Sequence, residues 1–442
     1  MTKHPPKLDR DFALLFMVML TIAAGNTALQ SVLPALGRLL SVPDSGVAAA
    51  FSVSALLWVI AAPFWAARSD RQGRRAMILL GMAGFVVSLT LCGIFLMAGI
   101  NGWISGPAAF VAFIAGRLIY GGFGAAAPPA VQALVAGRTT REERTKALTL
   151  IGSAFGLGTI LGPAVAPYLL LGSIGGVQIG LAGPAFIGAL FGLVMVIAVR
   201  RMLSDDRGMA PSQGAATAYP SIGGQSTGAS ITAATATGIE KISYRDPRIR
   251  GWMIAGLVMG HAQAMTGQTI GFLVIDRLNL APIAALQPTG LVLILGASAA
   301  LLVQWGLIPL LNLDPRRLML FGLVAAAIGT VLTGIATSLY GIALAFALAS
   351  AGFGFTRPGF TAGASLAVGP GGQGSVAGKV TSINGASFVL GPSIGVGLYS
   401  VYKPVPYLVA AAALMLLFGY ALRFLHASTQ TTANADEADP VI

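Results

Sequence analysis

Windows of about 20 apolar residues recur along almost the whole chain, and this pattern restricts the fold more than any other feature. An α-helix of that length crosses the roughly 30 Å hydrocarbon core of a bilayer. The composition agrees, because 55% of the 442 residues are hydrophobic and only 10% are charged, unlike a soluble globular domain. Gly, Pro and Ala are too common for the alternating strands of a barrel, so we predict an all-α membrane protein.

We delimit twelve such windows and expect each to be a transmembrane helix. They are 12–34, 46–66, 75–99, 106–136, 146–171, 178–199, 250–275, 285–310, 317–338, 340–368, 375–400 and 404–424. Residues 204–249 between the sixth and seventh windows are rich in Gly, Ser, Thr and Ala and cannot bury a core. We therefore expect an N-terminal six-helix bundle (1–203), a mobile cytoplasmic linker (204–249), a C-terminal six-helix bundle (250–426) and a disordered cytoplasmic tail (427–442).

The two halves repeat short motifs at a nearly constant distance. The triplet GFG occurs at Gly122–Gly124 and again at Gly352–Gly354, and LGP occurs at Leu161–Pro163 and again at Leu390–Pro392. A nearly constant offset indicates an internal duplication. Two six-helix repeats related by pseudo-symmetry, with a binding site at their interface, are typical of transporters that work by alternating access.

Basic residues gather in alternate loops. Of the 27 Lys and Arg residues, 22 fall at the termini or in and beside even-numbered loops, 3 in odd-numbered loops and 2 well inside the windows. The positive-inside rule then places both termini and every even loop in the cytoplasm. The net charge of +12 follows these loops, so it indicates membrane topology and not a nucleic-acid partner. We expect a multi-pass protein of the cytoplasmic (inner) membrane.

The loop after the second window is unusually charged for so apolar a chain. The segment AARSDRQGRR (66–75) resembles the signature loop of the major facilitator superfamily, Gly-x-x-x-Asp-Arg-x-Gly-Arg-Arg, except that Ala66 replaces the first glycine. The matching residues are Asp70, Arg71, Gly73, Arg74 and Arg75. A tight turn needs Gly73, and the arginines anchor the loop in the cytoplasm. The resemblance implies that Asp70 is a latch between the halves, with Arg138, Arg141 and Arg144 as candidate partners.

Two further segments carry the resemblance. FIAGRLIYGGFGAAAPP (113–129) resembles the family's buried-arginine motif, centred on Arg117. GSAFGLGTILGPAVAP (152–167) resembles the motif of the antiporter branch, carried here by Gly158, Gly162 and Pro163. IDRL (275–278) and GGQGSVAGKV (371–380) are similar to tetracycline-type drug–proton antiporters. The chain is thus identified as a member of the drug:proton antiporter branch, with twelve helices in two pseudo-symmetric halves.

Polar residues inside the windows outline a candidate substrate cavity. They are Asn26, Gln30, Gln132, Gln263, Gln268, Gln304, Arg357 and Asn384, with Phe388 among the neighbouring aromatics. Uncharged amides beside aromatic rings suit an amphiphilic ligand. Each amide taken alone could equally form an interhelical hydrogen bond. Arg117 and Arg357 are the two cations well inside the windows, where a charge costs at least about 2.5 kcal/mol and is functional by default.

A proton-coupled mechanism needs a side chain that changes charge. The first window contains no carboxylate, and Asp276 falls at the periplasmic end of the seventh. His261 is the only histidine inside a window, and histidine changes charge near neutral pH without a perturbed environment. We therefore name His261 and Asp276 as candidates for proton coupling. The alternative for His261 is a simple hydrogen bond within the bundle.

These observations predict a secondary transporter that exports small amphiphilic compounds in exchange for protons. The alternative is an importer or symporter of an organic anion or another small metabolite, and a second rival is a receptor that keeps the fold without transporting. We expect no enzyme, metal or cofactor, because nucleotide loops of the Gly-Lys-Ser/Thr type are absent and Cys92 is the only cysteine. The expected partners are a small-molecule substrate, protons and the lipid bilayer, with no nucleic acid, and we expect a monomer.

Overall fold

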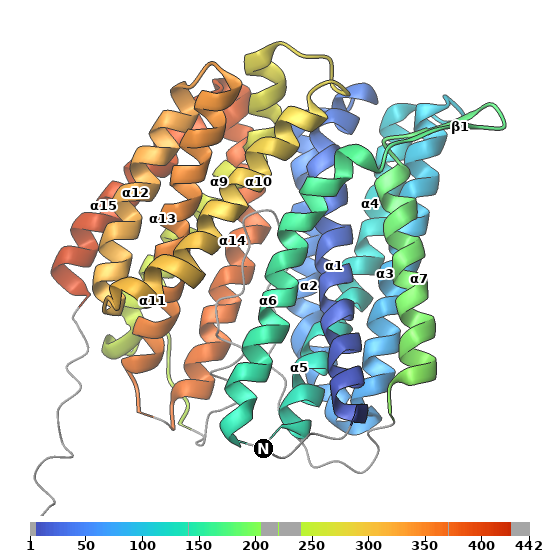
Figure 1. Ribbon diagram of the computed structural model, residues 1–442. Coiled ribbons are helices and arrows are strands. Elements are labelled where there is room, and N and C mark those ends of the chain that lie inside the picture. The colour runs from blue at the N-terminus through green and yellow to red at the C-terminus, as the bar shows by residue number, and fades with distance from the viewer. Residues whose placement is uncertain (1–5, 140, 205–219, 221–239, 370, 426–442) are drawn as a thin grey trace, which may run out of the picture.

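The computed structural model describes residues 6–139, 141–204, 220, 240–369 and 371–425. The first half forms one bundle of helices (Figure 1). Its elements are α1 (Pro6–Leu39), α2 (Asp44–Gln72), α3 (Arg74–Ile100), α4 (Gly106–Phe123), η1 (Gly124–Ala126), α5 (Ala127–Arg138), α6 (Arg141–Val165), η2 (Ala166–Tyr168) and α7 (Gly183–Met202).

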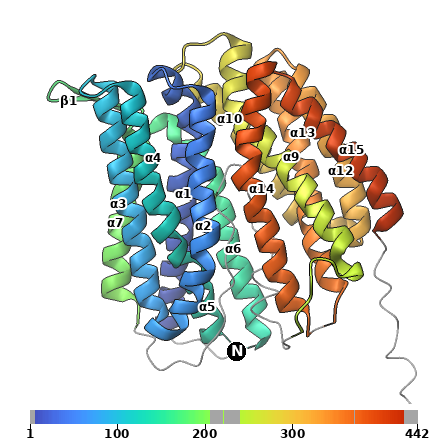
Figure 2. The same cartoon turned by 180° about the vertical axis from the view of Figure 1, so that it is seen from behind.

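The second half forms another bundle beside it, as the view from behind also shows (Figure 2). Its elements are α9 (Pro247–Leu278), α10 (Leu286–Leu302), the π-helical turn η3 (Val303–Leu307), α11 (Ile308–Leu311), α12 (Pro315–Ile335), α13 (Leu339–Leu366), α14 (Gln373–Val401) and α15 (Val405–Phe424).

Each of the twelve predicted windows contains helix, which confirms the predicted fold class. The fourth window is built from α4, η1 and α5, and the eighth from α10, η3 and α11. Within the described residues, 10 segments are long and apolar enough to cross a membrane. The helices α9 and α14 fall outside that set and contain many of the candidate site residues. The chain is a multi-pass membrane protein.

One predicted segment is wrong. Residues 171–180 form a β-hairpin, in which β1 (Leu171–Ile174) pairs antiparallel with β2 (Val177–Gly180). The fifth and sixth windows, 146–171 and 178–199, extended into this hairpin. Gly175 and Gly176 have φ values of 60° and 84°. Two consecutive residues with positive φ form the tight turn that matches the twist of a hairpin, so this glycine pair favours strands.

The predicted turn at Gly73 is confirmed. This single residue separates α2 from α3, and its φ of 92° lies in a region that other residues rarely adopt. We call the end of the molecule that contains this turn the Gly73 end. We call the opposite end, where α1 ends at Leu39 and α9 ends at Leu278, the Arg38 end.

The two bundles join most closely at the Arg38 end. One hydrophobic core runs from the first bundle into Phe272, Val292 and Tyr399 of the second bundle. A separate core, which includes Trp252 and Phe360, stays within the second bundle. In Figures 1 and 2 the bundles accordingly lean toward each other at the Arg38 end and apart toward the Gly73 end.

Candidate functional site

An arginine held by an amide lies inside the first bundle. Arg117 on α4 is only 1% exposed, and its Nη2 donates a hydrogen bond of 2.6 Å to Oδ1 of Asn26 on α1. Its guanidinium also lies over the rings of Phe51 and Tyr120, 5.4 Å and 4.9 Å from their centroids. Cation–π contacts of this kind stabilise a charge that has left water.

The second bundle contains the same arrangement. Arg357 on α13 is 1% exposed, and its Nε donates a hydrogen bond of 2.6 Å to Oε1 of Gln263 on α9. Its guanidinium lies 5.5 Å from the ring centroid of Phe388 on α14. The separation between the two amides along the chain is nearly the same as that between the two arginines. Both halves thus place an arginine of the fourth membrane-crossing helix against an amide of the first, which agrees with an internal duplication.

Side chains of the two bundles also contact each other directly. Gln30 on α1 donates from Nε2 to Oε1 of Gln268 on α9 at 3.2 Å. The hydroxyls of Ser52 on α2 and Ser393 on α14 are 2.8 Å apart. The structure therefore brings together Asn26, Gln30, Gln263, Gln268 and the two arginines at or beside the junction, as the polar pattern predicted.

Asn384 lies on α14, the helix whose Phe388 ring packs against the guanidinium of Arg357. Its side chain is 1% exposed, and it precedes Phe388 by one helical turn, so both residues share a face of α14. Thr361 follows Arg357 by one turn on α13 and is 7% exposed. Within the described part of the chain, neither the amide of Asn384 nor the hydroxyl of Thr361 has a hydrogen-bond partner. Thr361 was not among the predicted site residues, because a lone threonine in an apolar helix carries no distinctive signal.

The other two amide candidates lie on other helical segments. Gln132 is buried on α5, the helix that follows α4 and the short turn η1, and Gln304 lies in the π-helical turn η3. Val303, the residue before Gln304, packs against Gly354, about one turn before Arg357 on α13.

A residue of the linker reaches the first arginine–amide pair. Nδ2 of Asn26 donates a hydrogen bond of 2.5 Å to the backbone carbonyl of Pro220, and Pro220 is buried. The sequence analysis expected the linker to stay in the cytoplasm, and nothing in its composition signals this contact. The contact demonstrates that Asn26 can bind Arg117 through its oxygen while it donates to a carbonyl through its nitrogen.

Asp276 lies at the Arg38 end in an ionic network that joins the bundles. Its Oδ1 is 2.6 Å from Nη1 of Arg38 on α1, and its Oδ2 accepts a hydrogen bond of 2.7 Å from Tyr399. Nζ of Lys403 is 3.8 Å away, and Arg38 also binds Asp44 at 2.7 Å. We call these five residues the Arg38 network. Arg38 is one of the three basic residues assigned to odd-numbered loops, and it lies in the last turn of α1, as Asp276 lies in the last turn of α9.

His261 is remote from Asp276. Its Nδ1 lies 2.8 Å from the carbonyl oxygen of Leu257, one turn earlier in α9. The two candidates for proton coupling are separated by about four turns of the same helix, which corresponds to about 22 Å. The structure therefore does not combine them into one proton site.

The Gly73 loop makes its described contacts within the first bundle. Arg71 is exposed, Arg74 is 3% exposed, and Nη2 of Arg75 donates to the carbonyl of Arg200 at the end of α7 at 2.5 Å. The Asp70 side chain lies outside the described residues. Arg138, one of its candidate partners, binds Oδ2 of Asp11 on α1 at 2.6 Å.

The glycines of the antiporter-like segment form a close helix contact. A Cβ on Gly158 would lie 2.6 Å from the carbonyl oxygen of Leu20, and one on Gly162 would overlap Thr27 and Ala24, so α6 packs directly on α1. Pro163 faces the other bundle, because its carbonyl oxygen would lie 3.3 Å from a Cβ on Gly290 of α10. These residues therefore lie beside the junction between the bundles.

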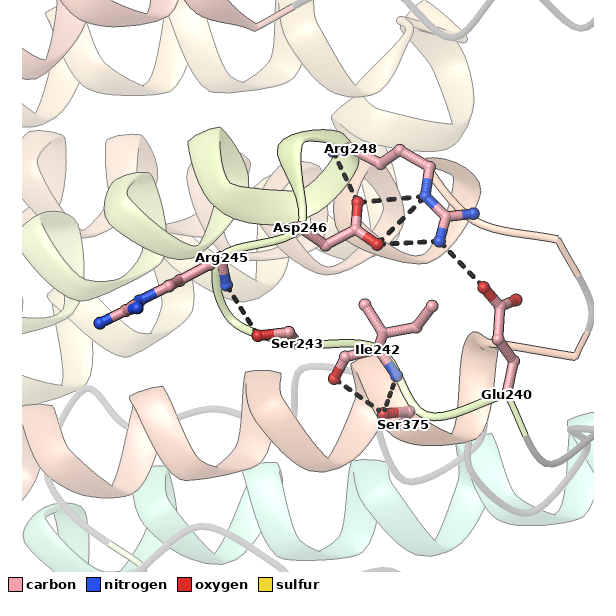
Figure 3. Close-up of polar contacts among 7 residues, drawn as sticks. All are labelled: Glu240, Ile242, Ser243, Arg245, Asp246, Arg248 and Ser375. Atoms are coloured by element: carbon pink, nitrogen blue, oxygen red, sulfur yellow. Dashed lines mark hydrogen bonds and ion pairs between the residues drawn. The ribbon is translucent and has the colours of Figure 1, made fainter.

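The end of the linker is bound to the second bundle at the Gly73 end (Figure 3). The N–H of Ile242 donates to Oγ of Ser375 on α14 at 3.1 Å, and Arg248 binds Glu240 at 2.9 Å and Asp246 at 2.8 Å. The hydrogen bonds from Arg248 hold the pKa of the Asp246 carboxyl below its ordinary value. Ser375 belongs to the GGQGSVAGKV segment, so part of that segment anchors the linker.

No group of three His, Cys, Asp or Glu side chains that could hold a metal ion occurs in the part of the chain that the structure describes. The arrangement offers cations, amides and aromatic rings at the junction of two bundles, and an ionic network at one end. Such a site can bind an amphiphilic molecule, and the network can respond to a change of charge.

Comparison with known families and curated proteins agrees with this geometry. A profile described as "Major Facilitator Superfamily" matches residues 15–313. The chain is 32% identical over 145 residues to the class B tetracycline resistance protein of Escherichia coli, covering 33% of this chain and 31% of that protein. It is 35% identical over 118 residues to major facilitator superfamily domain-containing protein 10 of Bos taurus, covering 27% and 23%. The alignments with these two relatives thus span about a quarter to a third of each relative's length.

Solved transporters share the fold over nearly the whole chain. The human organic anion transporter MFSD10 matches with a TM-score of 0.63 and 20% identity, covering 95% of this chain and 100% of that one. A bacterial homologue of the human lysosomal transporter Spinster, in an inward-facing and occupied conformation, matches with a TM-score of 0.71 and 10% identity, covering 95% and 97%. These similar proteins are transporters and not enzymes.

Proposed function

The chain belongs to the major facilitator superfamily, and on that premise we propose that it is a secondary transporter, which exports small amphiphilic compounds across the cytoplasmic membrane in exchange for protons. The two six-helix bundles (1–203 and 250–426) rock about their junction, so that the site opens to one side at a time. Both termini lie in the cytoplasm, and the protein acts as a monomer.

The observation that carries this proposal is the position of the two arginine–amide pairs. Asn26 with Arg117 and Gln263 with Arg357 come from opposite bundles, and the hydrogen bond from Gln30 to Gln268 connects the helices that bear the amides. Relative motion of the bundles therefore changes the distance between the two pairs. A ligand that contacts both pairs binds one arrangement of the bundles better than another, which is the requirement for a ligand-driven change of conformation.

The first test is the direction of flux. Inverted membrane vesicles that contain the protein are energised with a proton gradient, acidic inside, and the uptake of compounds from a susceptibility screen of an overexpressing strain is recorded. The proposal predicts that the vesicles accumulate the compounds and that a protonophore abolishes accumulation. Accumulation by right-side-out vesicles instead contradicts export.

Proton coupling through Asp276, His261 or both is part of the proposal. Arg38 joins Asp276 across the junction at 2.6 Å, so protonation of the carboxylate removes an ionic contact between the bundles. Reconstituted Asp276→Asn and His261→Gln are compared for substrate-driven proton flux with a pH dye. We expect at least one variant to lose coupling, and wild-type coupling in both means that another group carries the proton.

The second candidate function is import or symport of an organic anion. Arg117 and Arg357 favour it, because two buried guanidinium groups attract an anionic ligand and none of the predicted windows contains an acid in its middle. The name of the human organic anion transporter with the same fold points in the same direction. The flux experiment separates the two candidates, because they differ in the direction of transport.

A further inference from the structure

Two buried polar side chains on the helices around Arg357 have no hydrogen-bond partner among the described residues. Asn384 and Thr361 lie one turn from Phe388 and Arg357 respectively, and both are more than nine-tenths buried. Among the described residues, both side-chain polar atoms of Asn384 and the hydroxyl of Thr361 have no hydrogen-bond partner. A buried polar group without a hydrogen-bond partner costs free energy. A ligand that supplies the missing hydrogen bonds would explain why these groups are present.

These groups lie on two helix faces that meet where Arg357 packs on Phe388. Arg357 and Thr361 share a face of α13 at helical spacing, and Asn384 and Phe388 share a face of α14. The guanidinium of Arg357 lies over the Phe388 ring, at 5.5 Å, which joins the two faces. A third helix, α9, also contacts the guanidinium: Nε of Arg357 donates a hydrogen bond of 2.6 Å to Oε1 of Gln263, which orients the group.

The amide beside the arginine of the first bundle is used differently. Near Arg117, Asn26 uses its oxygen for the arginine and its nitrogen for the Pro220 carbonyl. The buried amide of Gln132, whose Oε1 has no partner among the described residues, lies on the next helix, α5.

We propose that Arg357, Asn384 and Thr361 form a subsite for the acidic group of an amphiphilic substrate, with Phe388 against its apolar part. We call these four residues the acid subsite. The guanidinium supplies planar N–H donors that match a carboxylate, and the amide N–H₂ and the threonine hydroxyl each supply one more donor. The inference rests on the proposed function only in assuming that ligands reach the junction of the bundles, and it is independent of the direction of transport and of proton coupling.

A matched pair of probes tests this chemistry. The full-length protein in detergent is titrated with 1-naphthylacetate and with 1-naphthylacetamide, which share the aromatic part and differ in the acid. Equilibrium dialysis gives the two dissociation constants. We expect wild type to bind the acid about tenfold or more tightly than the amide, since one charge-assisted contact is worth about that factor.

Substitutions test whether Arg357 is responsible for the preference for the acid over the amide. Arg357→Gln is expected to bring the ratio of the two constants close to one, and Arg357→Lys to leave part of it. Arg423→Gln, at an exposed arginine of α15, is the matched control and keeps the wild-type ratio. Equal binding of acid and amide by wild type, no binding of the acid, or an unchanged ratio in Arg357→Gln each overturns the acid subsite.

Two further variants separate binding from folding. Asn384→Leu and Thr361→Val remove unsatisfied buried groups, so the ligand-free protein is expected to unfold at an equal or higher temperature, while acid binding weakens severalfold. A purely structural role predicts a lower unfolding temperature with an unchanged acid-to-amide ratio, and that result contradicts the proposal. Loss of transport with intact acid preference contradicts the proposed function alone. Transport that does not distinguish acids from amides contradicts the acid subsite alone.

Discussion

At the scale of single residues, the buried arginines Arg117 and Arg357 depend strongly on their neighbours, because each carries a charge that has been removed from water. Arg117 is stabilised by the Asn26 oxygen and by two aromatic rings, and these contacts replace part of the water that it has lost. The planar guanidinium can stack on a ring and hydrogen-bond at its edge at the same time. An ammonium group offers only a compact charge, so lysine is not an equivalent residue here.

We predict that Arg117→Ala abolishes transport and that Arg117→Lys keeps only part of it. The alanine variant loses a charge-assisted hydrogen bond worth about 1.5–3 kcal/mol together with both stacking contacts. Initial transport rates are normalised to the amount of folded protein in the membrane, measured by size-exclusion chromatography of a fluorescent fusion. A lysine variant at the full wild-type rate would reduce the role of Arg117 to its charge.

Some of the residue-scale picture was accessible from sequence and some was not. Both arginines and their amide partners could be identified from the sequence as polar residues within apolar windows. A polar side chain inside a membrane is costly, so it usually has a partner or a function. The partners themselves, such as Asn26 for Arg117 across 91 residues, depend on tertiary packing. The Arg38 network was missed because its members lie at helix ends, where charged residues are common.

At the scale of helices, the packing of α6 on α1 holds the antiporter-like segment beside the junction. Gly158 and Gly162 allow the backbones to touch, and Thr27 on α1 donates to the carbonyl oxygen of Gly158 at 3.2 Å. Small residues of this kind are the usual means of close approach between membrane helices. Any larger side chain at these positions must push α6 away from α1.

We therefore predict that Gly162→Leu destabilises the protein by about 1–3 kcal/mol, the cost of overpacking a close contact. Gly156→Leu on the same helix is the control, because a Cβ there meets nothing within 4 Å. Thermal unfolding in detergent should show a lower midpoint for the first variant only. Equal midpoints for both variants would mean that α6 can move away from α1 at little cost.

The loop between α2 and α3 is a second feature at this scale. We predict that Asp70→Asn abolishes transport while the protein still folds and inserts, because the change removes a charge and keeps the shape of the side chain. Transport and surface accessibility of a cysteine reporter at the Gly73 end are measured in the same vesicles. Wild-type transport by this variant would exclude Asp70 as a latch.

At the scale of the whole molecule, apolar windows and basic loops were enough to predict twelve helices in two bundles. The hairpin was missed because window averages conceal a Gly-Gly turn. The linker contact at Pro220 was missed because a segment without periodicity gives no indication of where it binds. What the structure adds is the asymmetry between the ends, with the Arg38 network and a continuous core at one end and the linker anchor at the other.

The central claim is that the bundles rock about their junction and that the Arg38 network holds one of the two arrangements. Pairs of spin labels at Ser41 and Asn279 report on the Arg38 end, and pairs at Met202 and Leu366 report on the Gly73 end, all at exposed positions. Distance distributions by double electron–electron resonance are compared for wild type and Asp276→Asn in lipid nanodiscs.

Loss of one or two charge-assisted hydrogen bonds should shift the two-state population by about tenfold or more. We predict that Asp276→Asn lengthens the Ser41–Asn279 distance and shortens the Met202–Leu366 distance in the same molecules. If both distances stay fixed, or lengthen together, the bundles do not exchange access between the two sides of the membrane in the way proposed.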